Sequence, residues 1–435
     1  METLHFDLSQ EGNKFKPLNA TNGGPWHKRK AISQIRSNFA DYKAARIPYA
    51  RNHDYLYQAV YGGPYCHDIS CIFPNFDADP TDPASYDFAC TDEDILVCLE
   101  AGTKTFFRLG QSIEHQIKKH HTLPPKDFKK WAVICEHIIR HYTEGWADGF
   151  CHDMPYWEIW NEPDLDPEDA EVKRTWGGTK AQFFDLYEIT AKHLKGCFPH
   201  LKIGGPSLAH RVGWAEEFLA EMQKRNAPID FFSWHTYNIA PNKIMARGEK
   251  LHDLLVEYGY GHAESILNEW NYVKEWGENF GESLKVIHGM KGAAFVAACM
   301  CTAQQSHIDM LMYYDTRQSV FNGAFDYYTY EKLKGYYPLY WYGMFYDMEK
   351  EIPATETVEN VYSLCGVDKD GKVLSMVVYY HDDDIADKTV RLDFGKGGKY
   401  EVYLLDEEHD AQLVAVVEDT TFVMKNCTAL LIKEI

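Results

Sequence analysis

The chain has 435 residues, of which 45% are hydrophobic and 14% aromatic, and a formal net charge of -21 at pH 7. This length fits one large domain with a small appendage, and the charge argues against nucleic acid or an anionic membrane as a partner, because either would repel the chain. The densest basic run, residues 27–30, is expected to form the solvated start of a helix.

The cysteines and the first residues indicate a cellular compartment. Eleven cysteines are scattered over apolar stretches without paired CxxC spacing, which favours reduced thiols over a disulfide framework. The start METLHFDLSQ lacks a basic region followed by an apolar run, and no apolar run approaches the length of about eighteen residues that a membrane span needs. We therefore expect a cytoplasmic protein without a membrane partner.

Short apolar runs alternate with longer segments of helical period along most of the chain. This alternation is typical of a parallel sheet built from strand–helix units. Before it begins, residues 3–8 form a strand that we expect to join the C-terminal part of the chain, since no helix separates them from the next strand. The eight strands of the repeating part are expected at residues 16–21, 47–53, 105–110, 156–162, 202–206, 231–237, 265–270 and 310–315.

Helix signals occupy the segments between these strands. Thr91 and Asp94 form a variant capping box, and residues 179–195 are expected to form a helix that ends at Gly196 in a left-handed cap. One further helix has a regular apolar face, formed by Phe128, Trp131, Cys135, Ile138, Ile139 and Tyr142. The sequence therefore predicts an α/β fold, a (β/α)8 TIM barrel over residues 15–350.

The pattern changes after about residue 346. Segments of period two at residues 372–380, 389–394, 400–405 and 429–432 are separated by turns rich in Asp, Gly and Lys. We expect residues 351–435, together with residues 1–14, to form a small C-terminal β-sandwich domain. The aromatic run at residues 335–346 is expected to lie in the core of the last barrel helix.

Two glutamates lie four residues apart in the stretch YWEIWNEPDL. Alternation along the strand would place Glu158, Trp160 and Glu162 on one face, with Glu162 last, just before Pro163. In a barrel of this kind the chemistry lies at the carboxyl ends of the strands, so Glu162 is free to meet a ligand. Glu158 lies deeper, where a carboxylate is costly unless paired, and we expect it to pair with Arg51 or Arg108.

The seventh expected strand ends in SILNEW and places a second carboxylate, Glu269, at the equivalent position. Two carboxyl groups that face each other across a cleft are what glycoside hydrolysis requires. One must be protonated to donate to the leaving oxygen, and the other must be ionised to attack or to activate water. Mutual repulsion raises the pKa of one of the two groups and so separates these roles.

The motif from Trp157 to Asp164, WEIWNEPD, resembles the acid/base signature of clan A glycoside hydrolases and most closely that of glycoside hydrolase family 39, the β-xylosidase and α-L-iduronidase family. In that clan an Asn-Glu pair ends strand four and a second glutamate ends strand seven, as Asn161-Glu162 and Glu269 do here. Three further segments resemble motifs of the family. Residues 19–25 resemble its turn at strand one, Arg51 and His53 its motif at strand two, and His235 and Tyr237 its motif at strand six.

The resemblance implies Glu162 as acid/base, Glu269 as nucleophile and Asn161 as the partner of the sugar hydroxyl beside the reacting carbon. It also implies that Arg51 and Tyr237 hold the nucleophile ionised, and the two histidines of the matched motifs, His53 and His235, line the site. The expected activity is that of a retaining exo-glycoside hydrolase, a β-xylosidase, which acts on an oligosaccharide or glycoside through a covalent glycosyl-enzyme. No cofactor and no metal are expected, since phosphate-binding loops and metal-ligand spacings are lacking.

Departures from the family leave the sugar open. Asp54 stands where the family has Gly, and Arg108 and Gln111 stand where it has Glu and Phe. Arabinoside, galactoside, glucoside and uronide substrates therefore stay as alternatives, with Arg108 as a contact for a uronide carboxylate. A catalytically inactive carbohydrate-binding protein is the alternative from another class, and the sequence leaves the oligomeric state open.

Four other residues complete the expected pocket. Trp270 and Trp276 are expected to stack on a sugar ring. Asp315, just past the eighth strand, is expected to line the pocket together with Arg317. In contrast, His115, His120 and His121 are expected to be surface histidines, because they follow no metal-ligand pattern.

Overall fold

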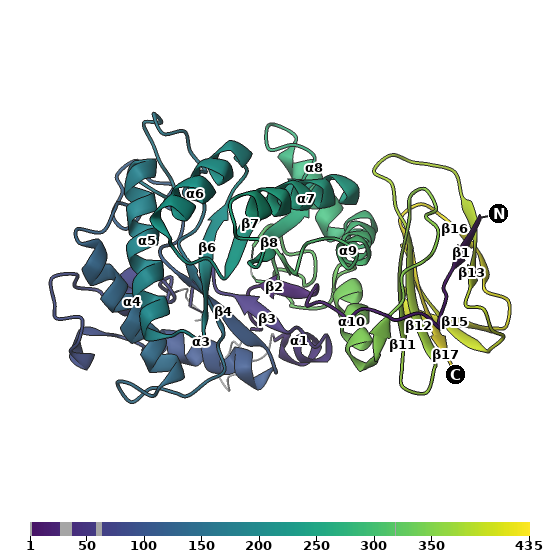
Figure 1. Cartoon of the computed structure of the whole chain (residues 1–435). Helices are drawn as coiled ribbons and strands as arrows, with labels where there is room; N and C mark the ends of the chain where they lie inside the picture. Colours follow the sequence, from purple (N-terminus) through teal and green to yellow (C-terminus); the bar gives the residue numbers. More distant parts are fainter. Residues whose placement is uncertain (1, 27–36, 58–62, 318) are drawn as a thin grey trace.

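Eight parallel strands close into a barrel in the computed structural model of the chain (Figure 1), which describes residues 2–26, 37–57, 63–317 and 319–435. Each strand pairs with the next along the chain, and the last pairs with the first, which confirms the predicted (β/α)8 barrel. The basic run at residues 27–30 lies outside the described residues. The barrel strands are β2 (Ala20–Asn22), β3 (Tyr49–Arg51), β4 (Lys104–Leu109), β5 (Tyr156–Ile159), β6 (Lys202–Leu208), β7 (Phe231–Asn238), β8 (Glu264–Tyr272) and β9 (Met310–Tyr313).

Helices surround the barrel, and their apolar faces cover its strands. The helix with the regular apolar face is α4 in the structure, and all but the first of the residues expected on that face are buried, as the spacing predicted. Among the described residues, no single helix is long and apolar enough to cross a membrane, although α8 and α9, bent by 77°, pass such a test as a pair. The helices are α1 (Phe39–Ala44), α2 (Ile69–Ile72), α3 (Ala89–Glu100), α4 (Phe128–Thr143), α5 (Lys180–Cys197), α6 (Val212–Arg225), α7 (Pro241–Glu257), α8 (Phe280–His288), α9 (Met290–Ala303) and α10 (Tyr336–Met344), with 3₁₀ turns at Pro83–Ser85 and Phe345–Asp347.

Two predicted helix ends are wrong. Thr91 does not cap α3, because it lies inside that helix and its hydroxyl donates to the carbonyl of Cys66. Gly196 lies inside α5, which ends one residue later because Phe198 precedes a proline and so disfavours helical backbone. The beginning of α5 is capped instead by Thr179 and Gln182, each of whose side chains accepts from the other residue's backbone N–H.

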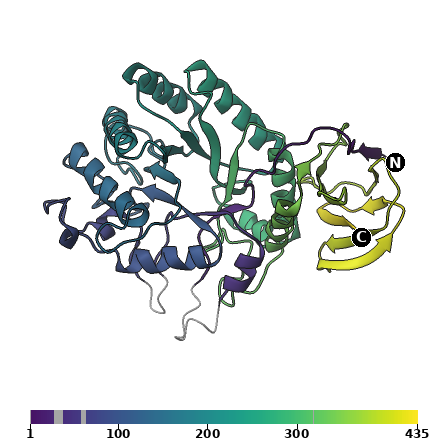
Figure 2. The same ribbon diagram turned by 60° about the horizontal axis from the view of Figure 1, so that its bottom comes forward.

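A β-sandwich lies beside the barrel and contains both ends of the chain (Figures 1 and 2). Its larger sheet has the order β10-β11-β12-β17-β14-β15, and its smaller sheet has the order β1-β13-β16. The first strand pairs in parallel with β13, which confirms that the N-terminal strand joins the C-terminal part. The strands are β1 (Glu2–His5), β10 (Lys350–Glu351), β11 (Val361–Val367), β12 (Val373–Tyr379), β13 (Lys388–Asp393), β14 (Tyr400–Leu405), β15 (Asp410–Val417), β16 (Thr421–Met424) and β17 (Thr428–Glu434).

The two faces of the larger sheet belong to different cores. Along β12, Leu374 and Met376 belong to the core that is continuous with the barrel helices, whereas Val373 and Val377 belong to the core between the two sheets. This alternation follows from the opposite directions of successive side chains in a strand. The aromatic run of α10 is part of the barrel core, as predicted, with Trp341 among its buried members.

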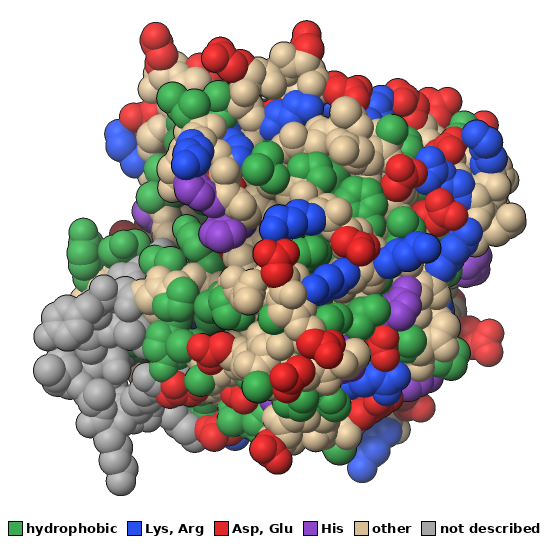
Figure 3. Space-filling model, turned by 90° about the vertical axis from the view of Figure 1, so that its left-hand side faces the viewer, with side chains coloured by type: hydrophobic (Ala, Val, Ile, Leu, Met, Phe, Trp, Pro, Cys, Tyr) green, Lys and Arg blue, Asp and Glu red, His purple; other side chains and the backbone are tan. Residues whose placement is uncertain are grey.

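The inside of the barrel changes from apolar to polar along its axis. At the amino ends of the strands an apolar layer closes it, formed by Ala20, Phe106, Tyr156, Phe231, Ile266, Met310 and Met312. Above this layer lie buried polar side chains, among them Asn22, Arg51 and Glu158. On the outside, the side of the barrel away from the sandwich carries acidic and basic side chains interspersed with hydrophobic ones (Figure 3). The barrel therefore has one polar interior end, at the carboxyl ends of its strands.

Candidate active site

A cavity of about 760 Å³ lies at the carboxyl ends of the barrel strands. This is the end where barrels of this architecture hold their sites. Three more predicted residues, Arg51, Asn161 and His235, are buried and contact the cavity wall from below. The predicted site residues that line the cavity directly are His53, Glu162, Tyr237, Glu269 and Trp276.

The two carboxylates meet over one imidazole. Glu162 Oε1 lies 2.7 Å from Nδ1 of His235, and Glu269 Oε2 lies 3.4 Å from the same nitrogen. One oxygen of each carboxylate lies within 4.8 Å of the other. A single small group that enters the cavity can therefore touch both carboxylates at once.

A fully buried arginine lies under Glu269. Arg51 donates from Nη1 to Glu269 Oε1 at 2.7 Å and from Nε to Glu158 Oε2 at 2.7 Å. Its third nitrogen, Nη2, donates to Asn161 Oδ1 and to Ser207 Oγ. Because removal of a charge from water is costly, the two carboxylates and the guanidinium compensate one another. The predicted pairing of Glu158 with Arg51 is confirmed, and Arg51 also serves Glu269.

The surroundings of the two carboxylates push their pKa values apart. Burial raises the pKa of Glu162 to about 8, with Asp164 and Asp54 adding negative charge nearby. Burial also raises the pKa of Glu269, to about 7, and the charge of Glu162 adds to this, but Arg51 opposes it. Tyr237 stabilises the ionised form further, since its hydroxyl donates to Glu269 Oε2 at 3.1 Å. The proton shared by the pair therefore resides preferentially on Glu162.

Two histidines border the carboxylates in their neutral form. Burial lowers the pKa of His235 to about 4, and its Nε2 lies 2.7 Å from Ser207 Oγ. Burial likewise lowers the pKa of His53 to about 3, and its Nε2 lies 3.2 Å from Asp54 Oδ2. Neutral imidazoles at these positions add no positive charge to the cavity, and His235 orients Glu162 by its hydrogen bond.

The backbone at the end of β5 corrects the expected strand face. The strand ends at Ile159, and both Trp160, with φ of 71°, and Glu162, with φ of 46°, lie in the left-handed region. Positive φ breaks the alternation of side chains, so Trp160 points outward, where its ring packs against Trp131 and its Nε1 donates to Thr175 O at 2.8 Å. The prediction that Trp160 shares a face with Glu158 and Glu162 is therefore wrong.

Trp270 was predicted to stack on sugar, and the structure contradicts this. It follows Glu269 on β8, so its side chain leaves the barrel interior and packs in the helix layer against Phe295. The ring is fully buried. Trp276, the other tryptophan expected to stack on a sugar, lines the cavity with 60% of its surface exposed.

Arg108 and Asp315 are also buried away from the cavity. Arg108 donates from Nη2 to Asp68 Oδ1 at 2.7 Å, so the segment after β3 supplies its counter-charge and it is withdrawn from a substrate carboxylate. Asp315 accepts from Ser319 Oγ at 2.9 Å, and burial raises its pKa to about 8. Arg317 forms an ion pair with Asp94 at 2.8 Å. Carboxylates from distant segments, which the sequence pattern does not reveal, hold the two arginines, whereas the partner of Asp315 lies four residues further along the same segment.

Several cavity residues have no motif in the sequence. Asp54 has a φ of 55°, a backbone conformation that glycine adopts without strain, and its side chain contacts the cavity. His115 is exposed, as expected, yet it also lines the cavity. The others are Arg174, His210, Arg247, Tyr314 and Phe321. Only the departure from Gly at residue 54 was a signal that sequence reasoning could have followed.

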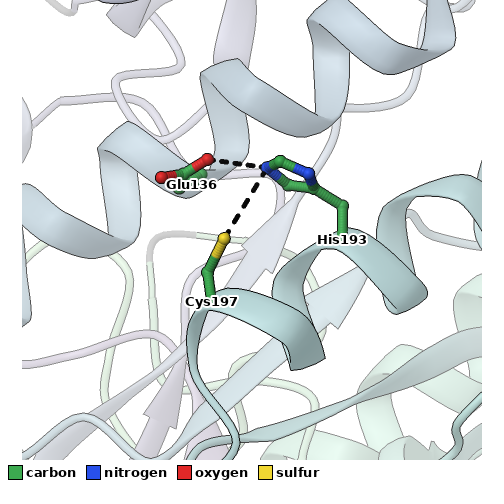
Figure 4. Close-up of side chains that lie close together, drawn as sticks. All are labelled: Glu136, His193 and Cys197. Atoms are coloured by element: carbon green, nitrogen blue, oxygen red, sulfur yellow. Dashed lines mark hydrogen bonds and ion pairs between the residues drawn. The ribbon is translucent and has the colours of Figure 1, made fainter.

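A second group of ligand-type side chains lies outside the barrel, between α4 and α5 (Figure 4). His193 Nε2 lies 2.7 Å from Glu136 Oε2 and 3.9 Å from the thiol of Cys197. The other oxygen of Glu136 accepts from Arg140 Nε at 2.8 Å. Glu136 therefore has both oxygens engaged, one by Arg140 and one by His193, and the group acts as a hydrogen-bond network that joins the two helices.

Comparisons with known proteins agree with this geometry. The model of glycosyl hydrolases family 39 matches residues 26–276. A β-xylosidase of Geobacillus stearothermophilus is 34% identical over 129 residues, which are 29% of this chain and 24% of that protein. A β-xylosidase of Caldicellulosiruptor saccharolyticus is 30% identical over 180 residues, 39% of this chain and 34% of that protein. The matched segments thus span between a quarter and about a third of the curated relatives.

Solved structures show the same fold at low identity. The glucosidase from Croceicoccus marinus superposes with a TM-score of 0.77 at 20% identity, covering 100% of this chain and 98% of that one. The family 39 enzyme from Xanthomonas axonopodis pv. citri gives a TM-score of 0.68 at 16% identity, with the same coverage of 100% and 98%. Both contain the barrel together with its β-rich neighbour, since the similarity extends over the whole chain.

Proposed function

The chain belongs to glycosyl hydrolases family 39, and we propose on this basis that it is a retaining exo-glycoside hydrolase, a β-xylosidase, with Glu269 as nucleophile and Glu162 as acid/base. The observation that supports this most directly is the close approach of the two carboxylates, within 4.8 Å of each other. Retaining enzymes keep their carboxyl groups about 5–5.5 Å apart, because the nucleophile must reach the sugar carbon itself, whereas inverting enzymes leave room for water.

In the first step the ionised Glu269 attacks the anomeric carbon, and the bond from this carbon to the leaving oxygen breaks. Glu162 gives its proton to that oxygen, so the leaving group departs neutral and a glycosyl ester forms on Glu269. Arg51 and Tyr237 favour the ionised nucleophile before attack. The unequal pKa values of the pair supply the proton on the residue that needs it.

In the second step water replaces the leaving group. Esterification removes the negative charge of Glu269, so the pKa of Glu162 falls and its carboxylate accepts a proton from the attacking water. The ester bond to Glu269 breaks, and the sugar leaves with its original anomeric configuration. Asn161 has its Oδ1 engaged by Arg51 and Ser207, which leaves Nδ2 to donate to the neighbouring sugar hydroxyl.

Aromatic side chains support a sugar ring in the cavity. The rings of Tyr237 and Trp276 lie 5.0 Å apart, and Phe321 lies 5.8 Å from Tyr237. Such faces bury the apolar side of a pyranose while its hydroxyls remain hydrogen-bonded. The xyloside specificity in the proposal comes from the two curated relatives, which are named β-xylosidases.

The experiment is a panel of nitrophenyl glycosides assayed with the wild type and with two glutamate variants. We expect the β-xyloside to be cleaved fastest and Glu269→Ala to be inactive until added azide yields a glycosyl azide of inverted configuration. With Glu162→Ala, azide should give the retained product, since the nucleophile is intact. Glu282→Ala, an exposed glutamate of α8, is the matched control and should behave as the wild type.

Two results would contradict the proposal. Activity of Glu269→Ala without azide would remove the nucleophile assignment. A wild type that binds but cleaves none of the glycosides would identify a carbohydrate-binding protein instead. If another nitrophenyl glycoside is cleaved faster than the xyloside, the mechanism stands and the specificity is corrected.

A further inference from the structure

The cavity has two chemically different sides. Toward β8 and β9 it is aromatic, with Trp276, Tyr314 and Phe321. On the opposite side, Arg174, His210 and Arg247 come from the loops after β5 and β6 and from α7. We refer to these three residues as the basic wall. The chain has a net charge of -21, so a cluster of basic side chains is a local exception to its negative charge.

Arg247 lacks a counter-charge of its own. Within the described parts of the chain it has no hydrogen bond or ion pair, and its Nε is buried without a partner. Its guanidinium lies 5.8 Å from the centre of the Trp234 ring. Burial lowers the pKa of Arg247, because a desolvated cation without a hydrogen-bond partner is costly. The other arginine of the wall, Arg174, is by contrast held by Asp166, whose Oδ1 accepts from its Nη2 at 2.7 Å and from its Nε at 3.0 Å.

The nearby carboxylate of Asp164 does not fill this role. Asp164 influences Arg247 electrostatically, but its oxygens accept from the backbone N–H groups of Ala209, His210 and Arg211 at 2.7, 3.2 and 2.9 Å. These bonds fix Asp164 at the beginning of α6. The donors of Arg247 therefore remain available to a group that enters the cavity.

The position of the basic wall relative to the reacting atoms assigns it to the leaving group. Glu162, the proposed proton donor, meets the leaving oxygen, so the leaving group extends beyond Glu162. Arg174 follows Glu162 in the same loop and acts electrostatically on it. His210 in turn experiences the charges of Arg174 and Arg247. The three side chains thus lie together beyond the proton donor, opposite the aromatic side.

We propose that the basic wall is a leaving-group subsite for an acidic saccharide, in which Arg247 binds the anionic group. A carboxylate of a uronosyl residue matches the planar fork of a guanidinium with two parallel hydrogen bonds, and a sulfate ester offers the same charge in another shape. A neutral leaving group offers Arg247 uncharged hydroxyl oxygens and no counter-charge, so the arrangement favours an anionic group over a neutral sugar. The placement of the leaving group rests on the proposed function, whereas anion binding by Arg247 does not.

The alternative is that Arg247 only covers the ring of Trp234, as arginine stems often do. The two explanations differ in what a substitution changes. A covering role affects stability and every substrate equally, because packing does not depend on the charge of the ligand. An anion-binding role affects the preference between a charged and an uncharged leaving group. The informative quantity is therefore a ratio of activities.

The first experiment compares 3-carboxyphenyl β-xyloside with its methyl ester, a pair that shares one ring and differs in charge. The ratio of their kcat/KM values is measured for the wild type, Arg247→Gln, Arg247→Lys and Lys250→Gln. Lys250 is the matched control, since it is exposed on the same helix and its loss removes the same charge. We expect Arg247→Gln to lower the ratio about 10- to 100-fold, Arg247→Lys to lower it less, and the control to keep it.

The second experiment measures binding without catalysis. Glucuronate, glucose 6-sulfate and glucose are titrated into the wild type and Arg247→Gln by calorimetry. We expect an acidic sugar to bind the wild type more tightly than glucose and Arg247→Gln to lose that difference. Preference for glucuronate identifies a carboxylate as the natural group, and preference for glucose 6-sulfate identifies a sulfate ester.

The outcomes separate this inference from the proposed function. If the wild type cleaves the ester but neither the activity ratio nor acidic-sugar binding depends on Arg247, the basic wall is no anion subsite and the proposed function stands. If the wild type cleaves neither glycoside but binds an acidic sugar through Arg247, the proposed function fails and the anion site stands. Equal losses on both substrates would assign Arg247 to packing on Trp234.

Discussion

The hydrogen bond from Tyr237 to Glu269 provides the sharpest test of the proposed division of roles. Tyr237→Phe removes a donor 3.1 Å from Glu269 Oε2 and leaves the ring in place. Because this bond favours the ionised carboxylate, its loss raises the pKa of Glu269. A hydrogen bond to a charged group contributes about 1.5–3 kcal/mol, and each pKa unit corresponds to about 1.4 kcal/mol. At 3.1 Å the bond is longer than a strong O–H···O⁻ contact, so the lower end applies and we expect a shift of about one unit.

The assay is the pH dependence of kcat/KM, which reports the ionisation of the free enzyme. Activity requires Glu269 ionised and Glu162 protonated. The acidic limb of the profile therefore follows Glu269, whose pKa is raised to about 7, and the basic limb follows Glu162, whose pKa is raised to about 8. The two limbs belong to a coupled pair, yet Tyr237 bonds to Glu269 alone of the two, so its loss moves chiefly the acidic limb. In Tyr237→Phe the acidic limb should move to higher pH by about one unit, so the pH range of activity narrows. At pH values below this limb, kcat/KM should be about tenfold lower than in the wild type.

A matched control is available in the same cavity. Tyr314 also lines it, and among the described residues its hydroxyl has no hydrogen bond to Glu269, so Tyr314→Phe should leave the acidic limb in place. The reasoning is refuted if Tyr237→Phe moves the basic limb alone, or if the two tyrosine variants shift the acidic limb equally.

Three further predictions follow from the buried groups. Glu158→Ala should lower the free energy of unfolding in urea by about 3–5 kcal/mol, because it leaves a fully buried guanidinium short of one partner. Glu221→Ala, at a partly exposed pair, should cost much less, and equal costs would contradict the buried pairing. Trp276→Ala should raise KM and leave the free energy of unfolding unchanged, because the ring is largely exposed in the cavity. Trp270→Ala should instead lower the free energy of unfolding by about 3–5 kcal/mol, because its ring is fully buried. A raised KM with unchanged stability for Trp270→Ala would indicate that Trp270 contacts the substrate. The pKa of Glu162 is raised from 4.5 to about 8 in the folded protein, so between these two pH values the folded state binds more protons than the unfolded state. The stability of the folded protein therefore falls as pH rises from the lower value to the higher one. Glu162→Gln has no titrating carboxyl group at this position and so lacks this loss of stability. The Tm of the variant minus that of the wild type should therefore increase from about pH 5 to about pH 8. A difference in Tm that stays constant with pH would show that the pKa of Glu162 is not raised.

Local sequence chemistry predicted the parts of this molecule that depend on periodicity. Alternating apolar runs and helical segments are sufficient for a (β/α)8 barrel, because the period of the apolar side chains reports which face each element buries. Position along a strand was sufficient to separate Glu158 from Glu162, since depth in the barrel decides which carboxylate needs an internal partner. The N-terminal strand was placed in the C-terminal part for a similar reason, the lack of a crossover helix.

Side-chain direction at strand ends was decided by the backbone and not by the pattern. The left-handed conformations of Trp160 and Glu162 reverse the expected face, and nothing in the letters of the motif reports them. The side chain of Trp270 points away from the barrel interior, yet it was assigned to the sugar because it neighbours Glu269 in sequence. Arg108 and Asp315 were assigned to the pocket from their place along the chain, but Arg108 donates to Asp68 of another segment and Asp315 accepts from the nearby Ser319.

The sequence by itself determined the barrel and the pair of glutamates, because period and position are properties of one segment at a time. Only the tertiary structure decided what surrounds that pair. Arg51 contacts Glu158, which is 107 residues away in the chain, and Glu269, which is 218 residues away. Arg247 lines the cavity from α7, where no sequence motif indicated it. Burial, counter-charge and the lack of a partner arise only when distant segments meet. They set the pKa values of the carboxylates and, among the described residues, leave the buried Nε of Arg247 without a hydrogen-bond partner.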